Sequence, residues 1–286
     1  MANSQVSRKD SEITLTITIP AKRVEEAFNL VKAAALRDVK VPGFRTGKAP
    51  GKLAESQLNE DRLSQALFQE VVPLAYAQAV SENKLKPIIP PQVSVVSFKK
   101  GEDLVFEAQT AESPQVNLKD YKKSLKSVKG KVIYGPKGEP VEDGSEKITA
   151  SQVLDKIRET AEISIPHILI DYEVQRMLSS LVDQVNSLGL TVDQYLSSQG
   201  KKPEDMQKEY HEIAERNLKD EFILNQISQE EKISASEKEI TDAIEAAPDD
   251  KTRERLQEQR GKAYLEDVLR KRKTIEYLIK TAEGKS

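Results

Sequence analysis

The stretch Ile13-Thr-Leu-Thr-Ile-Thr-Ile19 decides the fold at the start of the chain. Isoleucine or leucine alternates strictly with threonine, which is the period-two pattern of a strand with one buried face. Pro20 ends this run, because proline cannot donate a ladder hydrogen bond. The apolar residues from Val24 to Val39 then recur at helical spacing and stop at Val41-Pro-Gly43. The sequence therefore predicts a half-buried strand followed by a helix.

The elements that follow complete an N-terminal domain. A second helix is predicted from about Lys52 to Asn83, with a kink at Pro73. The runs Val93 to Phe98 and Leu104 to Ala111 are typical of two antiparallel strands in a hairpin. This β-α-α-β-β order predicts an α+β domain over residues 1–115.

A connector is predicted over residues 116–148. Between Lys122 and Lys147 the chain is rich in lysine and broken by Gly and Pro, a composition typical of linkers. It has room for one short strand at Lys131-Val-Ile-Tyr134 and too few apolar residues for a core of its own.

The rest of the chain has helical periodicity. Thr149-Ala-Ser-Gln152 and Ser236-Glu-Lys-Glu239 have the capping-box pattern, and Pro166 occupies a favoured first helical position. The last helix is predicted from about Thr252 to Thr281. Residues 149–286 therefore predict an elongated all-α domain with helical arms.

Composition narrows the class of protein. The 286 residues include 37% hydrophobic and 32% charged residues and no Trp, which favours long solvated helices over a thick enzyme core. A net charge of -3 gives no overall attraction to nucleic acid or acidic membranes. The chain has no Cys and no apolar run approaching the ~20 residues of a membrane span. We expect a cytoplasmic protein without disulfides.

A basic segment joins the two predicted helices of the first domain. From Val39 to Ala54 the sequence has no acidic residue, and its cations surround Phe44. Glycine at positions 43 and 47 allows tight turns. One interpretation is an exposed apolar anchor beside cations, suited to a phosphate-rich or carboxylate-rich partner. The alternative is an ordinary interhelical turn with Phe44 tucked inward.

The motif Gly43-Phe44-Arg45-x-Gly47-Lys48-x-Pro50 resembles the ribosome-binding signature of trigger factors, the ribosome-associated chaperones of bacteria. The resemblance extends through Lys84-Leu-Lys-Pro87 to Gln115-Val-Asn-Leu-Lys-Asp-Tyr121. It resumes, more loosely, at Val153-Leu-Asp-Lys-Ile157 and Ile165-Pro-His-Ile-Leu-Ile-Asp171.

The resemblance implies an ATP-independent chaperone that docks near the polypeptide exit of the ribosome and binds nascent or unfolded chains. Its implied docking residues are Gly43, Phe44, Arg45, Gly47, Lys48 and Pro50. Arg45 would make forked bonds to carboxylate or phosphate, Lys48 would add a point charge, and Phe44 would fill an apolar depression. Ribosomal protein and rRNA are the implied partners, without membrane or cofactor, and a homodimer off the ribosome is left open.

The chain departs from the family pattern at its centre. Family members usually carry a prolyl-isomerase domain of the FK506-binding type between the two resembling stretches, and here only the connector remains. Fewer than ~40 residues rarely fold alone, so we infer that this domain is absent. Two alternatives stay open: a prolyl isomerase, to be tested by proline-limited refolding, and an RNA-binding or scaffolding protein, to be tested by salt-dependent RNA binding.

Two other motifs lack the spacing or the residues that their chemistry requires. Gly43 to Lys48 has too few residues between its glycines for a nucleotide-binding loop, and Ala49 replaces the required Ser or Thr. His211-Glu-Ile-Ala-Glu215 has Glu where a zinc-protease helix needs its second His. We expect neither nucleotide nor metal chemistry.

Client binding is expected in the helical region, whose apolar stripes exceed what a thin bundle needs to bury. The candidate contact residues are Met177, Leu181, Ile223, Ile227, Leu265 and Val268. For each single position, the alternative is an ordinary core residue.

Overall fold

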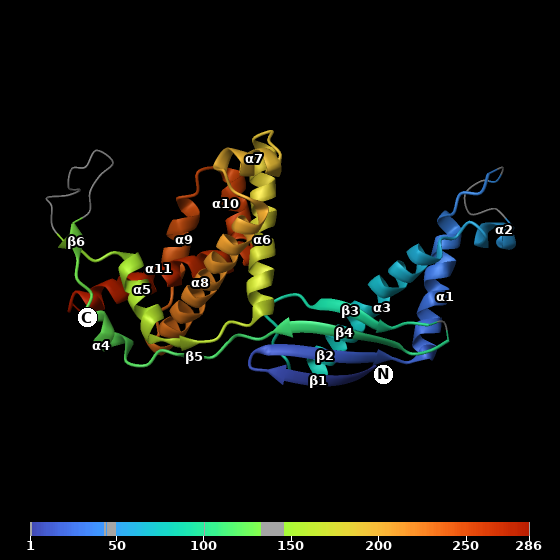
Figure 1. Cartoon of the computed structure of the whole chain (residues 1–286), viewed down its shortest axis with the longest axis horizontal. Helices are drawn as coiled ribbons and strands as arrows, with labels where there is room; N and C mark the ends of the chain where they lie inside the picture. Colours follow the sequence, from blue (N-terminus) through green and yellow to red (C-terminus); the bar gives the residue numbers. More distant parts are fainter. Residues whose placement is uncertain (1, 43, 45–49, 100, 133–145, 286) are drawn as a thin grey trace. The chain divides into compact units, whose positions relative to one another are not determined.

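The structure is a computed structural model that describes residues 2–42, 44, 50–99, 101–132 and 146–285. The chain forms two compact units (Figure 1). Each of them has an apolar core. The N-terminal unit comprises Met1–Ser113 and Pro166–Tyr172, and the helical unit comprises Pro114–Ile165 and Glu173–Ser286. No helix of the described part is long and apolar enough to cross a membrane.

The N-terminal unit is built on a four-stranded antiparallel sheet in the order β1-β2-β4-β3. The strands are β1 (Asn3–Lys9), β2 (Glu12–Ile19), β3 (Gln92–Ser97) and β4 (Leu104–Ala111). The predicted alternation in β2 is confirmed, because its isoleucines and leucine are buried while the threonines between them are half-buried. The β3–β4 hairpin is confirmed as well. Strand β1 is an addition that the sequence analysis does not predict.

Three helices accompany this sheet, namely α1 (Ala21–Asp38), α2 (Gly51–Glu55) and α3 (Glu60–Glu82). The single helix predicted from Lys52 to Asn83 is wrong, because α3 starts anew where Asn59 Oδ1 accepts a hydrogen bond from Arg62 N at 3.0 Å. Helix α3 continues through Pro73. Its buried residues Leu67, Ala75 and Ala79 pack in one core with the apolar face of β2 and β4.

The helical unit contains most of the remaining elements. They are α4 (Tyr121–Leu125), α5 (Ala150–Thr160), α6 (His167–Ser187), α7 (Val192–Gln199), α8 (Pro203–Glu230), α9 (Glu237–Glu245), α10 (Asp250–Gln257) and α11 (Gln259–Ala282), with the short pairs β5 (Val116–Asn117) with β8 (Glu162–Ile163) and β6 (Lys131–Val132) with β7 (Glu146–Lys147). The first residues of α6 belong to the N-terminal unit. Capping boxes at Thr149 and Ser236 are confirmed.

The final helix predicted from Thr252 to Thr281 is wrong in one respect, because it is two helices. The chain is extended at Glu258, with ψ of 156°, between α10 and α11. A Cβ atom built on Gly261 would lie 2.3 Å from the carbonyl oxygen of Arg255 and 2.5 Å from Cα of Leu256. Glycine at this position therefore permits the close approach of the two helices.

Part of the predicted connector packs in the core of the helical unit. Leu118, Tyr121 and Leu125 are buried together with Val153 of α5 and Leu278 of α11. The segment 133–145 lies outside the described residues. The N-terminal part of the connector is thus part of the core of the helical unit, although the connector has the composition of a linker.

Candidate functional site

The basic segment between α1 and α2 is described only in part. Gly43, Arg45, Gly47 and Lys48 lie outside the described residues. The Phe44 side chain is 46% exposed, and its backbone N–H donates to the carbonyl oxygen of Val41 at 3.1 Å. Pro50 is exposed, and its carbonyl accepts from the backbone of α2. The role of this segment in docking stays a prediction.

The six candidate client-binding residues fall into different environments. Ile223 and Ile227 are 1% and 0% exposed and belong to the core of the helical unit, which is the alternative that the sequence analysis leaves open for each position. Leu181 is buried and Met177 is half-buried on α6. On α11, Leu265 is half-buried and Val268 is exposed. Client contact at these four positions stays a prediction.

Met177 and Leu181 line a pocket between α6 and α8. Its volume is about 280 Å³, and its other lining residues are Arg176, Ser180, Gln184 and Tyr210. Behind it, Leu181 packs with Val185, Leu196 of α7 and Met206 of α8 in a small separate core. We call this part of the helical unit, residues 177–210, the helical arm.

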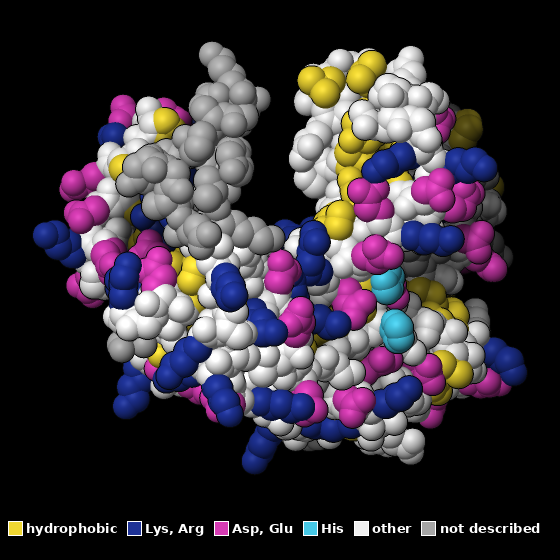
Figure 2. Space-filling model, turned by 60° about the vertical axis from the view of Figure 1, so that its left-hand side comes forward, with side chains coloured by type: hydrophobic (Ala, Val, Ile, Leu, Met, Phe, Trp, Pro, Cys, Tyr) yellow, Lys and Arg dark blue, Asp and Glu magenta, His cyan; other side chains and the backbone are white. Residues whose placement is uncertain are grey.

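The end of the helical arm carries apolar side chains that are open to solvent. Leu188 is 72% exposed, and Val182 and Leu190 are also exposed. Figure 2 shows hydrophobic side chains at the top of this arm and in a line below them. Gly189, with φ of +73°, lies between the two leucines and turns the chain into α7. The sequence analysis does not name these three as contact residues.

A second exposed apolar area lies on α11. Tyr264 is 63% exposed and Val268, one turn later, is exposed as well. Leu265 is half-buried beside them. Tyr264 is not among the predicted contact residues, although its spacing from Val268 places both on one helix face.

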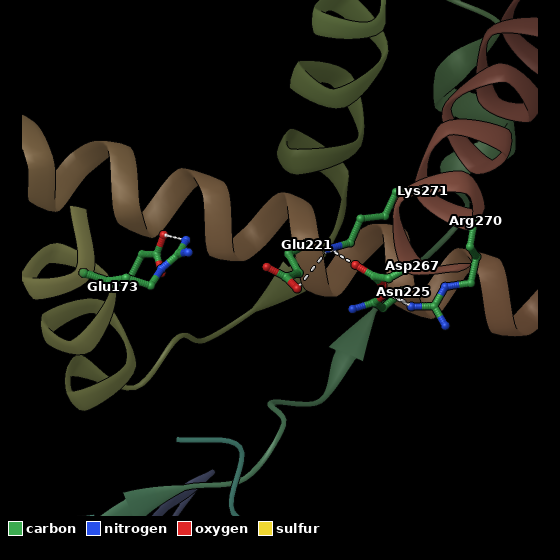
Figure 3. Close-up of polar contacts among 7 residues, drawn as sticks. Glu173, Glu221, Asn225, Asp267, Arg270 and Lys271 are labelled. Atoms are coloured by element: carbon green, nitrogen blue, oxygen red, sulfur yellow. Dashed lines mark hydrogen bonds and ion pairs between the residues drawn. The ribbon is translucent and has the colours of Figure 1, made fainter. Parts of the chain in front are cut away.

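Polar contacts hold α11 against α8 (Figure 3). Lys271 Nζ lies 3.1 Å from Glu221 Oε1 and 2.7 Å from Asp267 Oδ2. The Arg270 guanidinium donates to Asn225 Oδ1 at 3.0 Å and pairs with Asp267. Burial opposes the charged form of Lys271, yet its two carboxylate partners raise its pKa overall. These contacts fix α11, which carries the second apolar area, against α8.

A further polar cluster joins the connector to the helical unit at Glu231. Its carboxylate accepts from the hydroxyls of Tyr121 and Tyr277, both at 2.8 Å, and pairs with Lys122 Nζ at 2.6 Å. The ion pair with Lys122 is the main cause that lowers the pKa of Glu231. Burial, followed by the hydrogen bond to Glu231, raises the pKa of Tyr121. Helix α4 is therefore held by polar contacts as well as by its buried side chains.

The described residues contain no group of three or more His, Asp or Glu side chains placed to hold a metal ion. The helical unit carries exposed apolar side chains on α6, directly after α6 and on α11. Such surfaces bind other apolar chains reversibly, since burial of apolar area is non-directional.

These features define a two-unit protein with an N-terminal antiparallel sheet and a largely helical C-terminal region. Two sequence profiles cover the chain. The profile described as "Bacterial trigger factor protein (TF)" matches residues 1–142, and the one described as "Bacterial trigger factor protein (TF) C-terminus" matches residues 139–280. The chain belongs to the trigger factor family, and no isomerase domain separates the two matched regions.

Individual relatives agree with this assignment. The curated trigger factors of Staphylococcus aureus strains JH9 and Newman are 36% identical to this chain over 115 residues. The match covers 40% of this chain and 27% of each relative. This chain therefore spans about a quarter of the length of the curated relatives it matches.

A solved structure has a similar fold. It is described as "Promiscuous Substrate Recognition in Folding and Assembly Activities of the Trigger Factor Chaperone". The TM-score is 0.62 at 15% identity, and the similarity covers 97% of this chain and 100% of the other. At this identity the similarity establishes the fold alone.

Proposed function

We propose that this protein is an ATP-independent chaperone that docks on ribosomes and shelters nascent or unfolded polypeptides in the cytoplasm. Membership of the trigger factor family together with solvent-exposed apolar side chains on the helical arm carries this proposal. Exposed apolar surface of this kind marks interaction sites in soluble proteins. The similar solved structure, described as a trigger factor chaperone with promiscuous substrate recognition, supports the same reading.

Docking is assigned to Gly43, Phe44, Arg45, Gly47, Lys48 and Pro50, by their match to the family signature. The test is co-sedimentation of the variant Phe44→Ala/Arg45→Ala/Lys48→Ala with ribosomes. We expect binding to be lost while the melting temperature hardly moves, since surface substitutions usually change stability by no more than about 0.5 kcal/mol.

A matched control removes one apolar, one arginine and one lysine side chain elsewhere. The exposed residues Leu30, Arg23 and Lys22 on α1 serve this purpose as a triple alanine variant. This control is expected to bind ribosomes like the wild type. Unchanged binding of the loop variant would exclude the docking assignment.

Client binding is assigned to the helical arm and to the exposed face of α11. The arm variant Val182→Asn/Leu188→Asn/Leu190→Asn makes the exposed side chains polar without changing buried positions. We expect it to lose much of its ability to suppress aggregation of a denatured client, because the apolar area offered to the client falls. In the wild-type protein, the client is released because the contacts are individually weak and multivalent and because the client's own folding competes with binding.

The control for the arm variant makes the same number of exposed apolar residues polar in the N-terminal unit. The variant Leu30→Asn/Leu74→Asn/Ile88→Asn provides it. Full protection by the arm variant, or equal loss in both variants, would contradict the assignment to the arm.

A further inference from the structure

A basic surface lies at the start of the helical unit, on helix α4 and the turn after it. Six of the thirteen residues from Lys119 to Lys131 are lysine, and Asp120 is the one acid among them. The carboxylate of Asp120 caps α4 by accepting the backbone N–H of Lys123 at 3.2 Å. The whole chain has a net charge of -3, so this positive charge is a local concentration of the kind found in patches that bind polyanions.

The fold presents three of these lysines to solvent because it buries the apolar residues between them. Tyr121 and Leu125 are 4% and 0% exposed and belong to the core of the helical unit. Lys123, Lys126 and Lys129 are exposed, and we call these three the connector lysines. Lys126 still has helical backbone angles at the C-cap of α4, so its side chain neighbours that of Lys123 one turn earlier.

The lysines of this segment differ in their ion pairs. Lys119 Nζ lies 2.5 Å from Glu162 Oε1, and Lys122 Nζ lies 2.6 Å from Glu231 Oε1. Among the residues that the structure describes, the connector lysines have no ion-pair partner. Like charges at helical spacing repel each other, so an anion that binds across the connector lysines relieves this repulsion.

We propose that the connector lysines bind the phosphate backbone of RNA, at a site separate from the basic segment between α1 and α2. Lysine ammonium groups are compact charges that bind phosphate without forked geometry. The stretch from Lys119 to Lys131 contains no arginine, and its one aromatic ring, Tyr121, is buried. It therefore offers neither forked donors to read base edges nor an exposed ring on which bases stack, and binding depends on charge and not on base sequence.

RNA fits this surface better than an anionic membrane does. A basic helix that binds membranes also inserts an apolar face into the bilayer. The buried residues of α4 are Tyr121 and Leu125, and both face the protein core. RNA is the polyanion that docking on ribosomes brings within reach, so the choice of partner rests on the proposed function, whereas the charge of the surface does not.

The test measures how RNA binding by the full-length protein depends on salt. The probe is a fluorescein-labelled oligouridylate whose anisotropy is titrated at several salt concentrations. The patch variant Lys123→Gln/Lys126→Gln/Lys129→Gln removes three charges. Each phosphate neutralised on a single strand contributes about -0.7 to the slope of log K against log salt, so we expect the slope to become less negative by about 2. At low salt we expect about fivefold or greater loss of affinity.

Two controls separate a local site from general charge. The variant Lys208→Gln/Lys238→Gln/Lys251→Gln removes three exposed lysines of α8, α9 and α10, and its slope and affinity are expected to stay within about twofold of the wild type. Arginine at all three connector-lysine positions keeps the charge and is expected to keep the wild-type slope. Circular dichroism and melting confirm that all variants fold.

The outcomes separate this inference from the proposed function. All measurements are repeated in the docking variant Phe44→Ala/Arg45→Ala/Lys48→Ala, and the change of slope is expected to persist there. An unchanged slope in the patch variant overturns the inference, and so does binding to vesicles that contain phosphatidylglycerol without binding to RNA. Ribosome co-sedimentation on the same samples tests the docking assignment: its loss in the docking variant, with an unchanged slope in the patch variant, removes the RNA site alone.

Discussion

Leu125 of helix α4 tests whether the connector is part of the helical core. Its side chain is 0% exposed and packs in the cluster that contains Val153, Ile157 and Leu278. The substitution Leu125→Ala removes about three methylene groups, worth ~0.8 kcal/mol each on transfer from water. The cavity left behind adds to this loss, and buried Leu→Ala changes cost about 2–5 kcal/mol in total. A segment that is only a linker would lose almost nothing.

Urea unfolding of the full chain, followed by far-UV circular dichroism, measures this change. Because two units need not unfold together, the transition of the helical signal is compared between variants and not treated as one two-state event. The control is Lys123→Ala, an exposed position of the same helix, which is expected to change stability by less than about 0.5 kcal/mol. A loss below about 1 kcal/mol for Leu125→Ala would refute the assignment of α4 to the core.

Two further predictions concern Glu231 and Gly261. At neutral pH, Glu231→Gln is expected to cost about 1–3 kcal/mol, because Lys122 and two tyrosine hydroxyls share that carboxylate. The pKa of Glu231 is lowered in the folded protein, so its contribution to stability is present above the unfolded pKa of about 4.3 and is lost as pH falls. Urea titrations should show that the difference in free energy of unfolding between variant and wild type shrinks below about pH 4. A difference that grows there would contradict the reasoning. Gly261→Ala is expected to cost about 1–3 kcal/mol and to speed amide exchange at the α10–α11 junction, since its Cβ would meet the backbone at Arg255 and Leu256. The control Gly51→Ala, where a Cβ meets nothing within 4 Å, should leave exchange unchanged, and equal effects of the two variants would exclude the proposed close approach.

Local patterns in the sequence predict strands in which apolar and polar residues alternate and helices that begin with a capping box. Strand β2 follows directly from its alternation, and α5 from its capping box at Thr149. Strand β1 has no apolar period and exists through its backbone pairing with β2, which is a long-range property. No Gly or Pro stands at Glu258 itself, and the close approach of Gly261 to the backbone of α10 is a tertiary contact. Such breaks are set by tertiary contacts and are invisible to a helical pattern.

Tertiary contacts also limit what the sequence predicts about the candidate client-binding residues. Ile223 and Val268 both lie on apolar stripes at helical spacing, yet one is buried and the other exposed. Which stripe is covered depends on the helices that pack against it, and a single sequence does not provide that information. Leu188 and Leu190 flank the helix-ending Gly189, and both are exposed. The leucines beside this glycine are the signal that the sequence offers for the exposed end of the arm.

The isomerase domain is absent at a point of the chain, between β6 and β7, where its loss leaves the rest of the fold in place. The two family profiles meet at residues 139–142, and the described chain on either side ends in β6 and β7. These strands pair antiparallel, with Lys131 opposite Lys147 and Val132 opposite Glu146. An antiparallel pair holds its two ends adjacent whatever chain joins them, and insertion or loss of a domain is tolerated at such points. Helix α4 precedes β6 and helix α5 follows β7, and both pack in the core of the helical unit. Their core contacts therefore do not depend on a domain inserted between β6 and β7.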